Sequence, residues 1–207
     1  MFFRAFIFAI ILGSQSALAS DLLPIALSDA DKEQLSSGEI IVKVWRDKTR
    51  EDRAIDVFGV IDIPVPKNIV WDVMTDCARS QAIVPKMKSC EVVERAPDMS
   101  WDIREQKSKV NFMITHTSRF RSDYVKGLKI FIKNAGGDMD IQQGVWELIS
   151  LAPNMTRLRY RAASAPSFPV ASSRLIKGSQ ESLPIILENL REAAKSDYVQ
   201  TTAATLP

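Results

Sequence analysis

The sequence predicts an α+β fold, in which several antiparallel strands are followed by one long C-terminal helix. Three observations lead to this class. Over residues 57–76 the hydrophobic period changes from about 2 to about 3.6, as expected for a strand that runs directly into a helix. Residues 88–163 contain strand-like segments separated by short turns, and short connections favour antiparallel neighbours. Over residues 170–195 the apolar positions follow a helical period.

The first residues are typical of a cleaved signal peptide. Arg4 precedes an apolar run over residues 5–12, and small residues occupy positions 17 and 19, which fits cleavage after Ala19. An uncleaved membrane anchor is the alternative, but the run is shorter than the roughly 20 residues that span a bilayer. We therefore expect residues 1–19 to be a signal peptide and the protein to be periplasmic or secreted.

Charge and residue counts exclude several classes of protein. The 27 Lys and Arg residues nearly balance the 25 Asp and Glu residues, whereas nucleic-acid-binding domains usually carry a strong basic excess. We therefore expect no nucleic-acid partner. One histidine, His116, and two cysteines are too few for ordinary zinc sites. We predict no metal and no cofactor, and a chain of this length is expected to form one domain.

Residues 20–53 are predicted to form an N-terminal extension with a short helix and a strand. Ser28 is a suitable N-cap for a helix over residues 29–35, and Gly38 is available to end it. Residues 39–45 alternate loosely as a strand. The charge-rich residues 46–53 then form a solvated turn.

Two prolines impose the switch from strand to helix. Pro64 biases Ile63 toward extended backbone, and Pro66 has a φ suited to a first helical turn. The helix is expected to reach about Thr75, and residues 78–84 can form a second short helix. The strands expected after it cover residues 90–95, 101–107, 111–124, 128–134, 140–151 and 156–163.

The C-terminal helix is predicted over residues 170–195. Its apolar stripe includes Leu183, Ile186, Leu187 and Leu190. Residues 197–207 lack a periodic pattern, and we expect them to form a flexible tail.

The two cysteines, Cys77 and Cys90, lie thirteen positions apart in a chain that we expect to be exported. An oxidising compartment favours a disulfide between them, and we predict that bond. Two buried free thiols are the alternative, because cysteine is often a small core residue.

Several motifs carry a family resemblance. They are I-P-V-P at 63–66, V-W-D-V-M-T-D at 70–76, Pro85 with C-E-V-V at 90–93, G-V-W-E-L at 144–148, T-R-L-R-Y at 156–160, and the helix end at 187–194. This set resembles the START-like (SRPBCC, helix-grip) superfamily, in particular its coenzyme Q-binding and polyketide cyclase/dehydrase-type branch. The resemblance assigns residues 54–196 to one START-like domain. It implies a helix-grip fold, in which a curved antiparallel sheet wraps around the long helix and encloses an apolar cavity.

Alternate residues of each strand would line such a cavity. In each strand, we take the more apolar of the two sets of alternate residues as the one that faces the cavity. This gives the candidate ligand-binding residues, which are Trp101, Ile103, Phe112, Ile114, His116, Phe120, Ile130, Trp146 and Tyr160. Trp146 and Tyr160 could equally be ordinary core residues, and His116 could be hydrogen-bonded within the core. The opposite parity, which would face solvent, carries Lys129, Lys133, Arg157, Arg159 and Arg161.

The implied cavity, the lack of a convincing catalytic set and the expected export together lead us to expect an exported, non-enzymatic binding or transport protein. Its ligand would be a small hydrophobic molecule such as a lipid or quinone. One alternative is a cyclase- or hydrolase-type enzyme with His116 as acid/base and Glu105 or Asp123 as its partner. No Asp or Glu shares the strand face of His116, so we predict no catalytic residues. Another alternative is a packed interaction domain without a ligand. Transient contact of the cationic strand face with anionic lipid headgroups is a further expectation.

Overall fold

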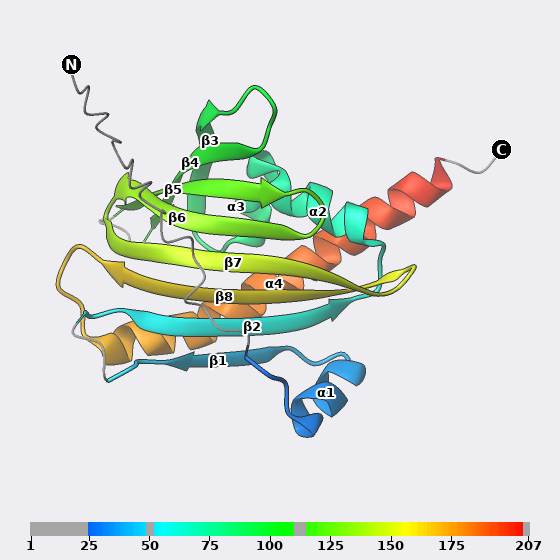
Figure 1. Cartoon of the computed structure of the whole chain (residues 1–207), viewed down its shortest axis with the longest axis horizontal. Coiled ribbons are helices and arrows are strands. Elements are labelled where there is room, and N and C mark those ends of the chain that lie inside the picture. The colour runs from blue at the N-terminus through cyan, green and yellow to red at the C-terminus, as the bar shows by residue number, and fades with distance from the viewer. Residues whose placement is uncertain (1–24, 49–51, 110–114, 205–207) are drawn as a thin grey trace, which may run out of the picture.

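The computed structural model describes residues 25–48, 52–109 and 115–204. An eight-stranded antiparallel sheet in the order β1-β2-β8-β7-β6-β5-β4-β3 curves around the long helix α4 (Figure 1). The strands are β1 (Ile41–Trp45), β2 (Ile55–Ile63), β3 (Met87–Arg95), β4 (Trp101–Lys109), β5 (Thr115–Val125), β6 (Lys129–Gly137), β7 (Met139–Ala152) and β8 (Met155–Pro166). The helices are α1 (Asp29–Ser36), α2 (Lys67–Thr75), α3 (Ser80–Ile83) and α4 (Ser172–Ala203), with a 3₁₀ turn η1 (Cys77–Arg79) before α3. The predicted helix-grip fold is confirmed.

The main hydrophobic core lies between α4 and the inner face of the sheet. Alternate residues of β2 are buried in it, and Leu187 of α4 is fully buried against them. Gly59 occupies the middle inward position of β2. A Cβ atom there would lie 3.0 Å from side-chain atoms of both Leu183 and Leu187, so glycine is what allows the helix to pack this closely on the strand.

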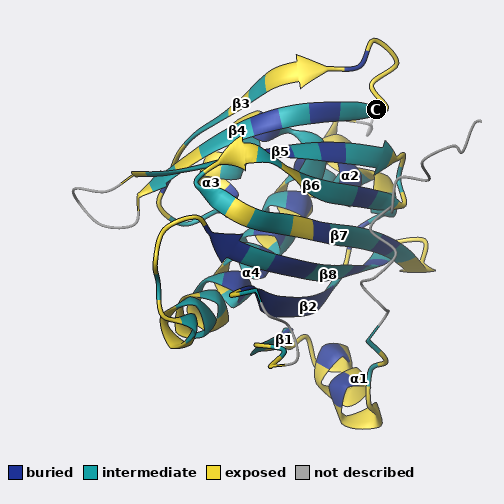
Figure 2. Cartoon of the chain, turned by 60° about the vertical axis from the view of Figure 1, so that its left-hand side comes forward, coloured by how far each residue is buried: buried dark blue, intermediate teal, exposed yellow. Residues whose placement is uncertain are grey.

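The outer face of β2 is covered as well. Phe58 and Val60 point away from α4 and form a second apolar cluster with Leu35 of α1 and Ile41 of β1. β2 is consequently buried on both faces, as its dark ribbon shows (Figure 2). The strand of the predicted N-terminal extension is therefore an edge strand of the same sheet, paired with β2 through Ile41 and Val60.

The strand-to-helix switch forms as the prolines predict. Pro66 is the N-cap of α2, with φ −60° and ψ 148°, and the helix ends at Thr75. The hydroxyl of Thr156 in β8 donates a 2.9 Å hydrogen bond to the carbonyl of Val65. This buried bond fixes the turn between β2 and α2 to strand β8 of the sheet.

The C-terminal helix is longer than the sequence predicts. It continues to Ala203, so residues 197–203 are helical and not part of an aperiodic tail. Tyr198 packs against the main core, and Asp197 forms an ion pair with Arg79. These long-range contacts supply the stabilisation that the local sequence pattern does not show.

Several predicted segments lie wholly or partly outside the described residues. They are the signal peptide at 1–19, the start of the N-terminal extension at 20–24, part of the charge-rich turn at 49–51, the first residues of the strand over 111–124, and the end of the tail at 205–207. None of the helices within the described ranges combines the length and the apolarity required to span a membrane.

Cys77 and Cys90 form a disulfide that ties η1 to β3, with their Cα atoms 5.5 Å apart. Both cysteines are therefore bonded and not free thiols. Since β3 is the other edge strand of the sheet, the bond attaches the segment after α2 to that edge.

We expect the double substitution Cys77→Ser with Cys90→Ser to lower the free energy of unfolding by about 3 kcal/mol. The cross-link closes a loop with a sequence separation of 13, and a loop of this length restricts the unfolded chain by about that amount. Urea unfolding would measure the difference. A reductant should destabilise the wild type to the same extent and leave the double variant unchanged. Equal stability of oxidised wild type and double variant would contradict the expectation.

Candidate functional site

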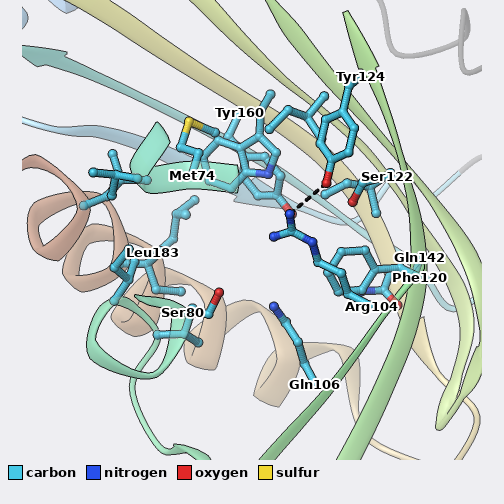
Figure 3. Close-up of a pocket in the computed structure, with 18 residues that line it drawn as sticks. Met74, Ser80, Arg104, Gln106, Phe120, Ser122, Tyr124, Gln142, Tyr160 and Leu183 are labelled. Atoms are coloured by element: carbon cyan, nitrogen blue, oxygen red, sulfur yellow. Dashed lines mark hydrogen bonds between the residues drawn. The ribbon is translucent and has the colours of Figure 1, made fainter. Parts of the chain in front are cut away.

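A cavity of about 270 Å³ lies between the inner face of the sheet and the helices α2, α3 and α4 (Figure 3). The helices contribute mainly aliphatic side chains, among them Met74 of α2 and Leu183, Ile186 and Leu190 of α4. These residues line the cavity because they belong to the apolar faces by which the helices pack on the sheet. We call this space the inner cavity.

The sheet contributes aromatic side chains to the same cavity. Trp146 of β7 and Tyr160 of β8 are directly paired across the two strands, and their rings stack with centroids 3.9 Å apart. Ile130 and Phe120 complete this wall from β6 and β5. A stacked aromatic pair offers a flat apolar surface to a ring system or an alkyl chain.

The remaining wall carries a buried polar cluster. The guanidinium of Arg104 donates to both carboxylate oxygens of Asp102, at 3.1–3.2 Å. Its Nη2 also donates to the Tyr124 hydroxyl and to the carbonyl oxygen of Thr75, at 2.7 Å each. The side chains of Arg104 and Asp102 are only 7% and 1% exposed. A buried charge of this kind is tolerated because it is paired and hydrogen-bonded.

Three donor groups point into the inner cavity. Figure 3 shows the polar ends of Ser80, Arg104 and Gln106 directed at its open centre from α3 and β4. The side-chain amide oxygen of Gln142 accepts a 2.8 Å hydrogen bond from Ser118. The inner cavity thus has an apolar side under α4 and a donor-bearing side on β4. A ligand that fills it should be mostly apolar and carry at least one hydrogen-bond acceptor.

The two cavity tyrosines predict a loss of stability at high pH. Burial raises the pKa of Tyr124 and of Tyr160 to about 12, compared with about 10 in an unfolded chain. Below pH 10 the two buried, neutral tyrosines make their full contribution to the free energy of unfolding. It is lost as the pH rises toward 12, because only the unfolded state releases these protons in that interval. Urea unfolding at pH 9 and pH 11 would show the decrease, and Tyr124→Phe should reduce it. Equal stability of the wild type at pH 9 and pH 11 would contradict the raised pKa values of the two tyrosines.

The structure brings only part of the predicted ligand-binding set together. Phe120, Ile130, Trp146 and Tyr160 line the inner cavity, whereas Phe112 and Ile114 lie outside the described residues. Whether any of the lining residues contacts a ligand stays a prediction.

The prediction that Trp101 and Ile103 face the cavity is wrong. In β4 the inward residues are Asp102, Arg104 and Gln106, so their apolar neighbours face outward. Trp101 packs under the guanidinium of Arg121, 4.1 Å from its ring centroid. Choosing the more apolar parity failed because β4 directs its polar side chains into the molecule.

His116 lies on the same face of β5 as Phe120 but does not line the inner cavity. Its Nδ1 lies 3.7 Å from a carboxylate oxygen of Asp138, and its ring is in edge contact with Phe168. Burial lowers the pKa of His116, and the charge of Asp138 partly opposes this shift. The ring is therefore neutral at pH 7.

The acidic partners expected for His116 lie on the other face of the sheet. Glu105 alternates with the inward Arg104, and Asp123 alternates with the inward Tyr124. Glu105 instead forms an ion pair with Lys107, and Asp123 binds cations of the outer face. The predicted acid/base pairs with His116 are therefore not formed.

The cationic residues of the outer strand face are paired with carboxylates. The pairs are Arg157–Asp62 at 2.7 Å, Lys129–Glu147 at 3.1 Å, Lys133–Asp123 at 3.2 Å and Arg159–Glu147 at 3.6 Å. The Arg161 guanidinium lies over the ring of Trp45, 5.9 Å from its centroid. This pairing neutralises much of the positive charge that the sequence places on this face. Within the described ranges, His, Cys, Asp and Glu side chains form no group of three or more that could hold a metal ion.

Solved structures with the same fold include human STARD10, a STAR-related lipid transfer protein and an aromatase/cyclase. Human STARD10 is 15% identical, and the match covers 91% of this chain and 88% of that chain with a TM-score of 0.63. The STAR-related lipid transfer protein from Xanthomonas axonopodis is 12% identical over 75% of this chain and 93% of that chain, also with a TM-score of 0.63. The Zhui aromatase/cyclase from a Streptomyces species is 13% identical over 72% and 96%, with a TM-score of 0.57. At these identities the matches show the fold alone.

The sequence itself matches a family model. No curated protein matches the chain, but the model described as polyketide cyclase / dehydrase and lipid transport matches residues 63–191. This span begins at the end of β2 and includes most of α4, so it contains every element that encloses the inner cavity. The chain therefore belongs to the polyketide cyclase / dehydrase and lipid transport family, within the START-like superfamily.

Proposed function

We propose that this protein is a non-enzymatic carrier that binds a small, mostly hydrophobic molecule in the inner cavity. The observation that carries the proposal is the cavity itself, which has an apolar side under α4 and donor groups on β4. The name of one structural neighbour, the STAR-related lipid transfer protein from Xanthomonas axonopodis, and the lipid transport in the description of the family support this choice.

The volume of the inner cavity limits the size of the ligand. A volume of about 270 Å³ is close to the lower end of the range for small-molecule sites. A single alkyl chain or a small ring system fits this space, whereas a lipid with two long chains does not. We infer that the enclosed part of the ligand is one chain or one ring system.

The lining residues favour binding over catalysis. Among the described residues that line the inner cavity there is no His, Cys, Asp, Glu or Lys, which are the usual general bases and nucleophiles. His116 lies outside this set and lacks the predicted partners. A cyclase-type reaction would therefore have to use the hydroxyl of Ser80, Ser122, Tyr124 or Tyr160. The raised pKa of both tyrosines opposes their use as bases at neutral pH.

We further propose that the protein acts after export. The predicted signal peptide over residues 1–19 supports this, and the disulfide between Cys77 and Cys90 fits an oxidising compartment. Contact with a membrane surface stays a prediction, and the pairing of the outer-face cations with carboxylates gives it little support.

Native mass spectrometry of the gently purified protein tests the proposal. We expect an additional mass from a copurified apolar molecule, and we expect Ile186→Trp to remove it by filling the inner cavity. Ile185→Trp is the matched control, because Ile185 is the neighbouring residue of α4 and is 49% exposed. A wild type that carries no adduct and is not stabilised by any of a panel of lipids and quinones would contradict the proposal.

A further inference from the structure

A second and larger hollow lies on the other side of the polar cluster. It has a volume of about 700 Å³ and extends from Trp71 of α2 to Met99 in the turn between β3 and β4. We call it the outer groove. Arg104 and Tyr124 line both the inner cavity and the outer groove, so these two side chains form a common wall.

A hydrogen bond joins the two members of the wall. The Nη2 of Arg104 donates to the Tyr124 hydroxyl at 2.7 Å, as the dashed line shows (Figure 3). Arg104 is also held by the Asp102 carboxylate and by the Thr75 carbonyl, and the ring of Tyr124 is in edge contact with Trp71. A movement of Tyr124 that breaks its hydrogen bond and its contact with Trp71 would open the wall and leave the guanidinium in place.

Two guanidinium groups share one carboxylate at the wall. Arg104 binds the carboxylate of Asp102 directly, and Nη2 of Arg95 lies 3.6 Å away with its side chain 45% exposed. Lys126 lines the same groove and is exposed. The groove as a whole is lined by three cations and four carboxylates, so an excess of positive charge exists only where Arg95 and Arg104 share Asp102.

Three other carboxylates line the outer groove. Asp76 forms an ion pair with Arg79 at 3.1 Å, and Asp98 accepts hydrogen bonds from the backbone and the hydroxyl of Ser100. Asp72 and Lys126 are both exposed, so water screens both charges. The partly exposed guanidinium of Arg95, which shares Asp102 with Arg104, is therefore the group at the wall that can bind an anion.

We propose that the outer groove is the second compartment of the ligand site and binds the anionic end of a single-chain amphiphile whose apolar end occupies the inner cavity. The inference rests on the proposed function, because it requires a ligand in the inner cavity. It explains how a chain too long for 270 Å³ is accommodated: the chain passes between Arg104 and Tyr124, and its carboxylate or phosphate lies against Arg95 and Lys126.

Three probes separate this inference from the proposed function. 1-Octanol is short and uncharged and tests the inner cavity alone, whereas dodecanoate and 1-dodecanol have the same chain and differ in the charge of the head group. Binding of each would be measured by calorimetry, below micellar concentrations, to the wild type and to the variants Arg95→Gln and Lys126→Gln. Lys177→Gln is the control, because Lys177 is an exposed cation of α4 outside both compartments.

We expect each groove variant to weaken dodecanoate binding by about fivefold to tenfold, as the loss of one charge-assisted contact implies. Binding of 1-dodecanol should change by less than about twofold, and the control should behave as the wild type. If 1-octanol binds but the groove variants do not discriminate dodecanoate from 1-dodecanol, the second compartment is refuted and the proposed function stands. If none of the three probes binds the wild type, both are refuted.

Discussion

Asp102→Ala is expected to lower the free energy of unfolding by about 3 kcal/mol. The substitution leaves the buried guanidinium of Arg104 without its carboxylate, and removing one partner of a buried ion pair typically costs about 3–5 kcal/mol. We place the effect at the lower end because Arg104 keeps its bonds to Tyr124 and to the Thr75 carbonyl and because Arg104 lines a cavity that water can enter. Urea unfolding monitored by tryptophan fluorescence would measure the change.

Asp123→Ala is the matched control for this prediction. Asp123 also forms ion pairs within the sheet, with Arg121 and Lys133, but it lies on the outer face and its side chain is 27% exposed. Partly exposed pairs usually contribute less than about 1 kcal/mol. Equal losses for the two variants would show that the Asp102 pair is not desolvated as the structure describes.

Leu187→Ala is expected to destabilise the protein by about 3 kcal/mol. Leu187 is fully buried between α4 and β2, and truncation of such a leucine removes apolar contacts and leaves a void, at a cost of about 2–5 kcal/mol. The backbone at Gly59 adds to the effect, because its missing Cβ lets the leucine side chain approach to van der Waals distance. Thermal and urea unfolding would both report the loss.

Ile185→Ala, two residues earlier on the same helix, provides the comparison. Ile185 is 49% exposed, so its truncation should change the free energy of unfolding by less than about 1 kcal/mol. A small effect of Leu187→Ala, comparable with this control, would contradict the packing of α4 into the concave face of the sheet.

The sequence predicts the elements of this fold well, because they depend on local chemistry. The prolines at 64 and 66 and the change of hydrophobic period mark the boundary between β2 and α2, and the short turns mark the antiparallel strands. The end of α4 depends on contacts of Tyr198 and Asp197 with residues distant in the sequence. No local pattern reveals these contacts, so the sequence predicts a helix that is too short.

The polar half of the site could not be predicted from hydrophobic alternation. That rule assigns apolar side chains to the interior, whereas β4 buries Asp102 and Arg104 and turns Trp101 outward. A signal was present in the sequence: a carboxylate and a guanidinium at i and i+2 of a strand share a face and can neutralise each other. The position of His116 beside Asp138, in contrast, depends on the packing of β5 against the turn between β6 and β7.

Binding of a small apolar ligand in the inner cavity can be observed by NMR of the methyl-labelled protein during titration with 1-octanol. We expect the methyl resonances of Ile130, Ile132 and Ile186, which line the inner cavity, to shift with a common dissociation constant. The methyl resonances of Ile41, which packs in the cluster on the outer face of β2, should stay in place. Shifts confined to the Ile41 cluster, or no shift in any of these methyl groups at saturating 1-octanol, would contradict binding in the inner cavity.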